Sequence, residues 1–128
     1  MQIKDPRDFT FGDVADVNRQ RAERWHKGFP NDSWTGADWA TALAGETGEV
    51  CNVVKKLRRQ DAGIVQADNS SRDARIKALA TELGDVFLYL DLLAQFYELD
   101  LATCITETFN RVSVREGFPE RLMTEDTE

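Results

Sequence analysis

Histidine, cysteine and proline are scarce in this sequence of 128 residues, which contains one, two and three of them respectively. Zinc sites and disulfide frameworks need several histidines or cysteines at short, regular spacing, and Cys51 and Cys104 have no such spacing. Both lie in helical patterns, so we interpret them as small buried thiols. His26 has no nucleophilic serine or cysteine motif beside it, and we interpret it as a surface or loop residue.

An excess of basic charge and long apolar runs are missing as well. The chain has 16 Lys and Arg against 23 Asp and Glu, a net charge of −7, which argues against a general nucleic-acid binder and leaves room only for a local basic patch. The longest apolar stretch is far shorter than the roughly 20 residues that cross a bilayer, and the N-terminal residues lack the apolar segment of a secretory signal. We therefore expect a cytoplasmic protein with neither nucleic-acid nor membrane partners. The apolar and charged fractions are those of one globular domain over residues 1–128.

Apolar residues at helical spacing predict the first half of the fold. We expect an extended arm over residues 1–9 and a first helix from about Thr10 to His26. Its inner face should carry Val14, Val17, Ala22 and Trp25. After a loop over residues 27–34, a second helix should begin near Thr35, which has the spacing of a capping box with Asp38. The apolar stripe of that helix contains Trp39, Leu43, Val50, Val53, Val54 and Leu57.

The second half of the chain predicts two more helices. A polar loop over residues 61–71 leads to a third helix at about 72–98, with Ser70 and Asp73 as its capping signal. This helix is apolar almost all round, which is typical of a helix that is central or covered by another subunit. Asp100 can cap a fourth helix at about 101–116, and Gly117 fits its C-terminal end. Its inner stripe should consist of Leu101, Ile105, Phe109 and Val112.

These elements, with no strand signal of weight, predict an all-α fold that is most simply a four-helix bundle. Its core would span about residues 10–121, between the short N-terminal arm and an acidic, frayed tail from Met123 to Glu128.

Two short acidic motifs interrupt the apolar stripes of the second and third helices. Glu46 and Glu49 are three residues apart on one helix, and Glu82 and Asp85 are three residues apart on the next, so each pair shares a helix face. If the two helices are antiparallel neighbours, both pairs converge on one pocket. Buried carboxylates need a neutralising cation, and hard oxygen ligands without His or Cys favour Mg²⁺, with Mn²⁺ as a substitute. The alternative is that these are ordinary exposed acids on amphipathic helices.

Other residues near the motifs could complete a site. Lys56 lies about two turns after Glu49 and could meet a phosphate, and Asn52 shares roughly the same face, although a basic helix end is often only solvated. Trp25 or Trp34 could stack on a base, whereas Trp39 should belong to the core. Gly45, Gly48 and Gly84 lie beside the acids, where they allow either close helix approach or room for metal and phosphate.

The stretch from Trp39 to Arg59, with Ala-Gly-Glu-Thr-Gly-Glu-Val at its centre, resembles the first half of the MazG-like motif. The segment Glu82-Leu-Gly-Asp-Val-Phe-Leu-Tyr-Leu is similar to the second half, and the segment after Asn110 that ends in Gly-Phe-Pro119 is similar to the closing part. The match covers about residues 14–121. It places the chain near the all-α nucleoside triphosphate pyrophosphohydrolases, which include dimeric dUTPases and dCTP pyrophosphatases.

The resemblance implies hydrolysis of a nucleoside triphosphate, often a deoxynucleotide, to the monophosphate and pyrophosphate, with Mg²⁺ and assembly as a homodimer or homotetramer. It implies that Glu46, Glu49, Glu82 and Asp85 are the metal ligands. From the mechanism of metal-assisted hydrolysis we expect Glu46 or Glu49 to take the proton from the attacking water. Residues at positions that face the substrate in relatives are Tyr89, Asn110, Lys56 and Asn52. Many members have two adjacent glutamates at the start of the first motif, whereas here the first of them is Gly45.

We therefore predict a Mg²⁺-dependent pyrophosphohydrolase that controls or cleans (deoxy)nucleotide pools. One alternative is a non-catalytic helical module that senses a nucleotide through the same metal site, and another is a purely structural interaction module. Base selection is expected to depend on the loop between His26 and Thr35, and the base itself is left open between cytosine and guanine types.

Overall fold

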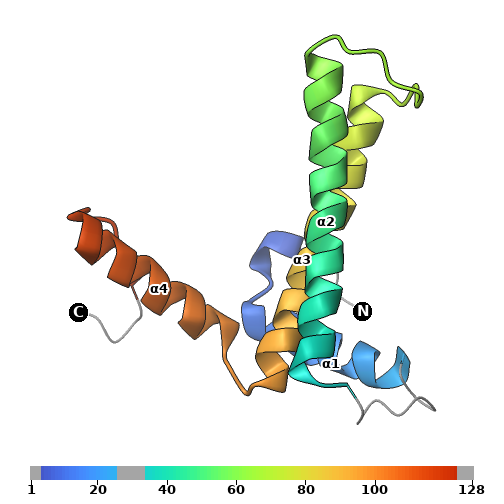
Figure 1. Ribbon diagram of the computed structural model, residues 1–128. Coiled ribbons are helices and arrows are strands. Elements are labelled where there is room, and N and C mark those ends of the chain that lie inside the picture. The colour runs from blue at the N-terminus through green and yellow to red at the C-terminus, as the bar shows by residue number, and fades with distance from the viewer. Residues whose placement is uncertain (1–3, 26–33, 124–128) are drawn as a thin grey trace.

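The structure is a computed structural model that describes residues 4–25 and 34–123. A 3₁₀ turn at Pro6–Asp8 (η1) precedes four α-helices: α1 at Phe11–Trp25, α2 at Gly36–Asp61, α3 at Arg72–Phe96 and α4 at Leu101–Glu116 (Figure 1). No strand occurs in the described ranges. The prediction of an all-α fold with four helices is confirmed, although the arm expected to be extended contains the η1 turn.

Local capping signals set the helix boundaries. The Asp38 carboxylate accepts a hydrogen bond from the Thr35 backbone N–H at 2.7 Å, as the predicted capping box requires. Asp100 accepts from the Thr103 N–H at the start of α4, and Gly117 ends that helix in the left-handed conformation with φ of 75°. The cap predicted for α3 is wrong by one residue: Ser71, not Ser70, accepts from the Ala74 N–H at 3.1 Å.

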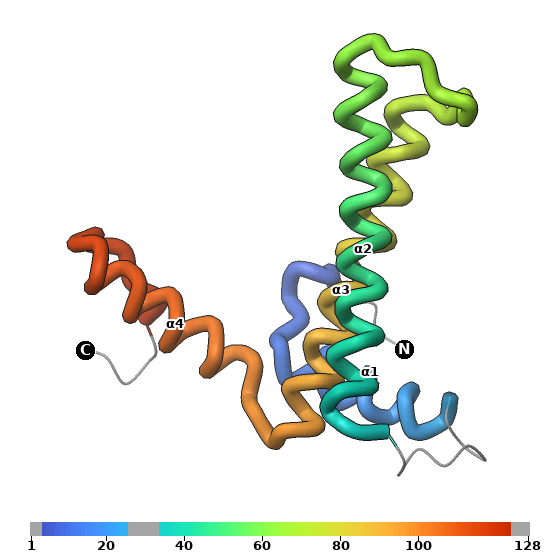
Figure 2. The backbone as a smooth tube through the Cα atoms, viewed as in Figure 1, coloured from blue at the N-terminus to red at the C-terminus, as the bar shows by residue number. Residues whose placement is uncertain are grey.

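The long helices α2 and α3 form an antiparallel hairpin, and α1 packs on α3 near the base of that hairpin (Figure 2). The hairpin confirms that the two acidic motifs lie on neighbouring antiparallel helices. The fourth helix projects away from the hairpin, so one chain does not close into a compact bundle (Figure 1).

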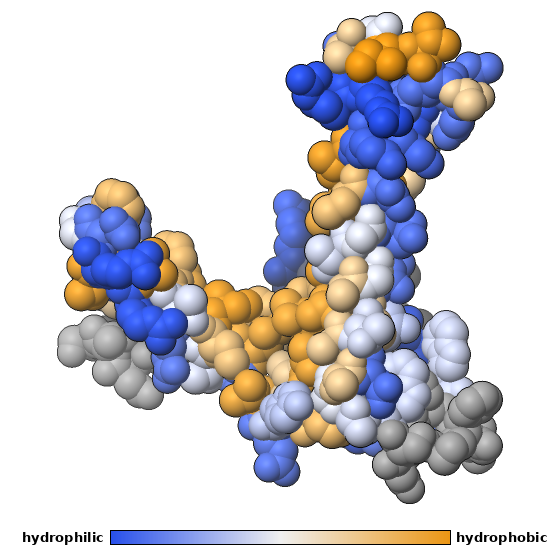
Figure 3. Space-filling view, in the orientation of Figure 1, coloured by the Kyte–Doolittle hydropathy of each residue, from blue (hydrophilic) through white to orange (hydrophobic). Residues whose placement is uncertain are grey.

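The single chain has little core of its own. Among the described residues, the buried apolar side chains are Trp39, Leu57 and Ala94, and no large side chain is completely enclosed. The predicted burial of Trp39 and Leu57 is confirmed. The prediction of an inner stripe on α4 is partly wrong within one chain, since Ile105 and Phe109 are exposed. Apolar side chains cover the surface from the base of the hairpin to the start of α4 (Figure 3).

The inner face predicted for the first helix is only partly right, since Val14 and Ala22 are half-buried but the other two residues are not. Val17 is 66% exposed and Trp25 is 78% exposed, whereas Asn18 is only 5% exposed. Cys51 is exposed and Cys104 is half-buried, so the prediction of two buried thiols is also wrong. None of the helices in the described ranges combines the length and the apolar composition that crossing a membrane requires.

Candidate metal and nucleotide site

Three carboxylates meet where α2 and α3 face each other. Glu46 lies midway along α2, and Glu82 and Asp85 lie one turn apart on α3. One carboxylate oxygen from each residue lies within 4.8 Å of the others, and all three side chains are half-buried. The helical spacing and the antiparallel pairing therefore bring three of the four predicted carboxylates together, Glu46 from the first motif and both residues of the second.

Mutual repulsion and partial burial act on this cluster. The pKa of Glu46 is raised above its ordinary value, first because burial disfavours the charged carboxylate and then because Asp85, Glu82 and Glu49 are negatively charged. A cation placed among these oxygens would remove the repulsion. The cluster is thus a site that favours either a proton or a positive ion.

Glu49 is not part of the close cluster. It is exposed on α2, one turn after Glu46, and it lies outside the group of oxygens within 4.8 Å. Its charge nevertheless contributes to the raised pKa of Glu46, which keeps it in the neighbourhood of the site.

A cavity of about 440 Å³ adjoins the carboxylates. Helices α1, α2 and α3 all contribute to its wall. The lining residues are Asn18, Arg21, Ala22, Trp25, Trp34, Trp39, Glu46, Asp85, Leu88, Tyr89 and Leu92. The volume is in the range of small-molecule sites, and the wall combines aromatic rings with a few polar groups. Two of the carboxylates that could hold a metal ion are therefore part of the same wall as an aromatic pocket.

The aromatic residues of the cavity form a connected group. The ring centroids of Trp34 and Trp39 are 4.5 Å apart, and those of Trp39 and Tyr89 are 6.5 Å apart. Trp25 and Tyr89, both predicted to face the substrate, line this cavity. The loop expected to select the base falls on residues 26–33 and lies outside the described residues, whereas Trp34 at its end does line the cavity.

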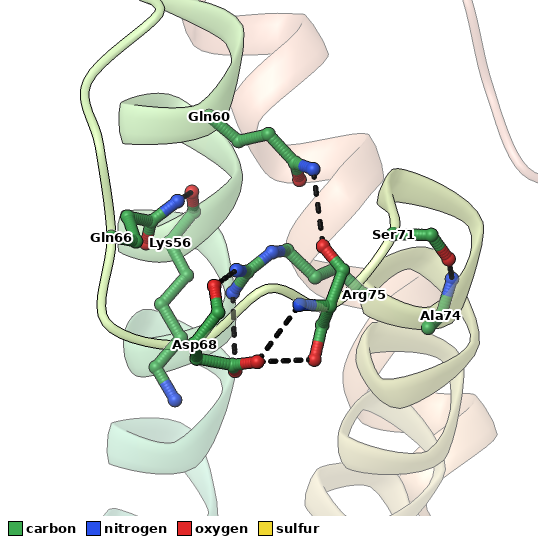
Figure 4. A network of polar contacts seen from close by, with 8 residues as sticks. Lys56, Gln60, Gln66, Asp68, Ser71, Ala74 and Arg75 are labelled. Atoms are coloured by element: carbon green, nitrogen blue, oxygen red, sulfur yellow. Dashed lines mark hydrogen bonds and ion pairs between the residues drawn. The ribbon is translucent and has the colours of Figure 1, made fainter.

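Two of the predicted substrate residues on α2 do not line the cavity. Lys56 lies toward the far end of the hairpin, where its backbone carbonyl accepts a hydrogen bond from Gln66 (Figure 4). The side chain of Lys56 lines a small crevice there with Asp68 and Arg75. The Asn52 side-chain carbonyl accepts a hydrogen bond from Lys55 at 3.5 Å. The predicted common face with the carboxylates thus places neither residue in this cavity within one chain.

Asn110 is occupied by a structural role within the chain. Its amide donates to the Leu122 carbonyl at 2.9 Å and accepts from the Leu122 N–H at 2.8 Å. This pair of bonds holds the segment after Gly117 against α4. Since α4 projects away from the hairpin, Asn110 does not belong to the cavity wall.

The interpretation of α1 from its apolar pattern missed two polar residues of the cavity. Arg21 contributes a permanent positive charge to the wall, and Asn18 contributes a buried amide. A polar residue at helical spacing with Val14 and Ala22 was the available signal, because Asn18 lies one turn from each. The pattern alone gives no reason to prefer Asn18 over Val17 for burial.

The helical glycines beside the acids border open space. Beyond the adjacent residues and the nearby backbone of its own helix, a Cβ atom added at Gly45, Gly48 or Gly84 would meet no atom of the described residues within 4 Å. Close approach of α2 and α3 therefore does not explain the presence of these glycines within one chain. The space remains available to a bound molecule or to another subunit.

The donor set fits a hard divalent cation. Carboxylate oxygens are the ligands that Mg²⁺ and Mn²⁺ prefer, and the cluster of Glu46, Glu82 and Asp85 contains no His or Cys. Three half-buried carboxylates this close together would repel strongly without such an ion.

Comparison with known proteins identifies a family domain that spans the cluster. Residues 35–117 match the MazG nucleotide pyrophosphohydrolase domain, a range that includes all four motif carboxylates. The chain is also similar to the Gene 37 protein of Mycobacterium phage L5, with 36% identity over 86 residues, which are 66% of this chain and 70% of that protein.

Proposed function

The chain belongs to the MazG nucleotide pyrophosphohydrolase family, and from this premise we propose that it is a Mg²⁺-dependent enzyme that converts a (deoxy)nucleoside triphosphate to the monophosphate and pyrophosphate. The proposal extends to nucleotide-pool control in the cytoplasm. The observation that carries it is the adjacency of a three-carboxylate cluster and an aromatic cavity, which share Glu46 and Asp85.

We assign the metal to Glu46, Glu82 and Asp85. We include Glu49 as a fourth carboxylate ligand, whose side chain would move toward the cluster when the ion binds. When bound, Mg²⁺ neutralises charge on the phosphate oxygens and lowers the pKa of a coordinated water. Mn²⁺ is the expected substitute because it takes the same oxygen ligands.

The chain's own groups would bind the substrate and accept the proton. Glu46 or Glu49 accepts the proton of the attacking water. Trp25 and Tyr89 bind the base and sugar in the cavity, and Arg21 supplies positive charge to the wall. The half-buried position of the carboxylates limits the water that competes for the phosphates.

We further propose that the active form is a homodimer or homotetramer. The exposed apolar surface and the projecting α4 support this, since a chain of this size ordinarily buries a core. The resemblance gives Lys56, Asn52 and Asn110 substrate-facing positions, and since they do not line the cavity of their own chain, we assign them to the substrate of a second copy in such an assembly.

A direct assay tests the proposal. Purified protein is incubated with Mg²⁺ or Mn²⁺ and a panel of dNTPs and NTPs, and the released pyrophosphate and monophosphate are measured. We expect equal amounts of both products, and no turnover after chelation of the metal. Absence of pyrophosphate from every substrate, with helicity intact, would refute the enzymatic proposal, and nucleotide binding without turnover in calorimetry would favour the regulatory module instead.

A further inference from the structure

A buried polar network joins α1 to α3 behind the cavity. Asn18 and Asp91 are 5% and 4% exposed, and the Asn18 amide nitrogen donates to Asp91 Oδ2 at 2.8 Å and to the Leu88 carbonyl at 2.9 Å. Gln95 donates to the same Asp91 oxygen at 2.8 Å and to the Ala15 carbonyl at 3.1 Å. Each helix thus donates an amide to a backbone carbonyl of the other, and Asp91 binds both amides.

This network fixes which end of the Asn18 amide faces the cavity. A carboxylate and a backbone carbonyl can only accept, so both partners of Asn18 require its nitrogen. Rotating the amide by 180° would place the Asn18 oxygen against two other oxygens and break both bonds. The orientation is therefore set by chemistry, whichever way the side chain is first placed.

The remaining polar atom of Asn18 is its carbonyl oxygen, which accepts no hydrogen bond from the described residues. In the described ranges, the side-chain nitrogen and oxygen atoms that are both fully buried and without a hydrogen-bond partner belong to Gln60 and Arg75. Since the Asn18 oxygen has no partner and is not among them, some of its surface is accessible. Asn18 lines the 440 Å³ cavity and also a neighbouring cavity of about 560 Å³ beside Phe9 and Val17. Its fixed acceptor stands where the two cavities adjoin, and the 440 Å³ cavity is the one whose wall also contains Trp25 and Tyr89.

The burial of the Asp91 side chain is explained by these hydrogen bonds. No ion pair in the described part of the chain involves Asp91, and a buried carboxylate without a cation is costly. The amide N–H groups of Asn18 and Gln95 offset part of that cost. In return, Asp91 holds both amides in one orientation.

We propose that Asn18 is a specificity-determining residue that accepts a hydrogen bond from an N–H group on the substrate's base, and that Asp91 is the positioning residue that keeps the Asn18 oxygen toward the cavity. The inference rests on the proposed function and adds how the base is read. A fixed acceptor in a site built for hydrogen bonding rejects a base that presents an acceptor at the same place.

Paired substrates test this even while the preferred base is unidentified. Cytosine and uracil interchange a donor and an acceptor at positions 4 and 3, and adenine and hypoxanthine do so at positions 6 and 1. A fixed acceptor must favour one member of a pair, whichever of these atoms it faces. The readout is the ratio of kcat/KM for dCTP against dUTP and for dATP against dITP, a ratio that does not depend on the fraction of folded protein.

Three variants separate recognition of the base from folding of the protein. Asn18→Leu keeps the size but removes the acceptor, and we expect the larger ratio to fall about tenfold. Asp91→Leu removes one of the two bonds that orient the amide and should reduce the ratio less. Asp91→Asn should keep the wild-type ratio, because one amide oxygen can still accept from both Asn18 and Gln95 while the Leu88 and Ala15 carbonyls hold those amides in place.

Side-chain NMR of Asn18 supplies a readout that needs no substrate. Its amide protons should exchange slowly with solvent in the wild type and in Asp91→Asn, and faster in Asp91→Leu. A wild-type enzyme that turns over both members of each pair equally, or an Asn18→Leu enzyme that keeps the wild-type ratios, would overturn the inference alone. Absence of turnover with every triphosphate would instead overturn the proposed function on which it rests.

Discussion

Glu46, Glu82 and Asp85 place three negative charges within 4.8 Å of one another, and this repulsion separates their roles in stability and in activity. We predict that Glu82→Gln and Asp85→Asn each lower kcat/KM by at least about 100-fold, since a lost metal ligand removes several kcal/mol of charge stabilisation. The same changes relieve repulsion, so the thermal midpoint of the metal-free protein should stay the same or rise. Measured activity close to that of the wild type in both variants would show that the carboxylates hold no catalytic ion.

The raised pKa of Glu46 predicts a pH dependence with a definite sign. A carboxyl whose pKa is higher in the folded state than in the unfolded state binds its proton more tightly when folded, so its contribution to stability is lost as pH rises through the folded pKa. The metal-free protein should therefore become more stable as the pH falls from neutral to mildly acidic. Thermal melts at constant ionic strength measure this.

Divalent metal should reverse this trend, because the ion and the proton compete for the same oxygens. With saturating Mg²⁺ the stabilisation by metal should grow with pH, and in Glu46→Gln the pH dependence should weaken with or without metal. Identical pH profiles for Glu46→Gln and wild type would place the titrating group elsewhere.

Single residues also show where prediction from sequence succeeds and where it stops. Glu46, Glu82 and Asp85 could be predicted because a charge in an apolar stripe is visible in the sequence and helical spacing fixes its face. Asn18 and Asp91 could not, because their burial depends on how α1 crosses α3, which no local pattern encodes. Lys56 shows the opposite error, since a shared helix face does not mean a shared site when the helix is 26 residues long.

At the scale of helices, boundaries were predictable because caps are local. Asp100, Gly117 and the Thr35–Asp38 pair act within one turn of the residues they cap, and the structure has each of them in its expected role. The start of α3 at about residue 72 was predicted correctly, but its cap was off by one residue because Ser70 and Ser71 are both competent caps. The structure distinguishes them: Ser71 accepts from Ala74, whereas the Ser70 hydroxyl donates to Asp68 at 2.6 Å.

This difference yields a matched pair of variants. Ser71→Ala removes the cap of the helix that carries Glu82 and Asp85, and we expect a loss of about 1 kcal/mol in the free energy of unfolding. Ser70→Ala removes a bond within the exposed loop and should cost clearly less. Urea titrations followed by circular dichroism measure both, and a larger loss for Ser70→Ala would contradict the assignment of the cap.

At the scale of the whole molecule, the expected bundle and the observed chain differ in one respect that has a physical reason. Helices α2 and α3 pack along their length, but α4 projects away from them and leaves Ile105 and Phe109 exposed (Figure 1). Because α3 is apolar almost all round, its sequence predicts that other helices cover most of its surface, and one chain does not provide enough helices to do so. Sequence periodicity shows that a face is apolar, but it does not show whether the same chain or another copy covers it.

The apolar face of α4 gives the clearest test of assembly. Phe109 is 42% exposed in the single chain, and fully burying a Phe side chain contributes about 1.5–3 kcal/mol, so the exposed part offers about 0.6–1.3 kcal/mol per copy. In a twofold interface Phe109→Asp removes this contribution twice, so the association constant should fall by at least about tenfold. Light scattering after size exclusion should show a homodimer or homotetramer for the wild type and a smaller species for this variant. Thr108→Asp adds the same charge at an exposed polar position of α4 and serves as the control. A wild-type protein that is monomeric at all concentrations would contradict the proposed assembly, and activity retained by that monomer would show that one copy suffices for the site.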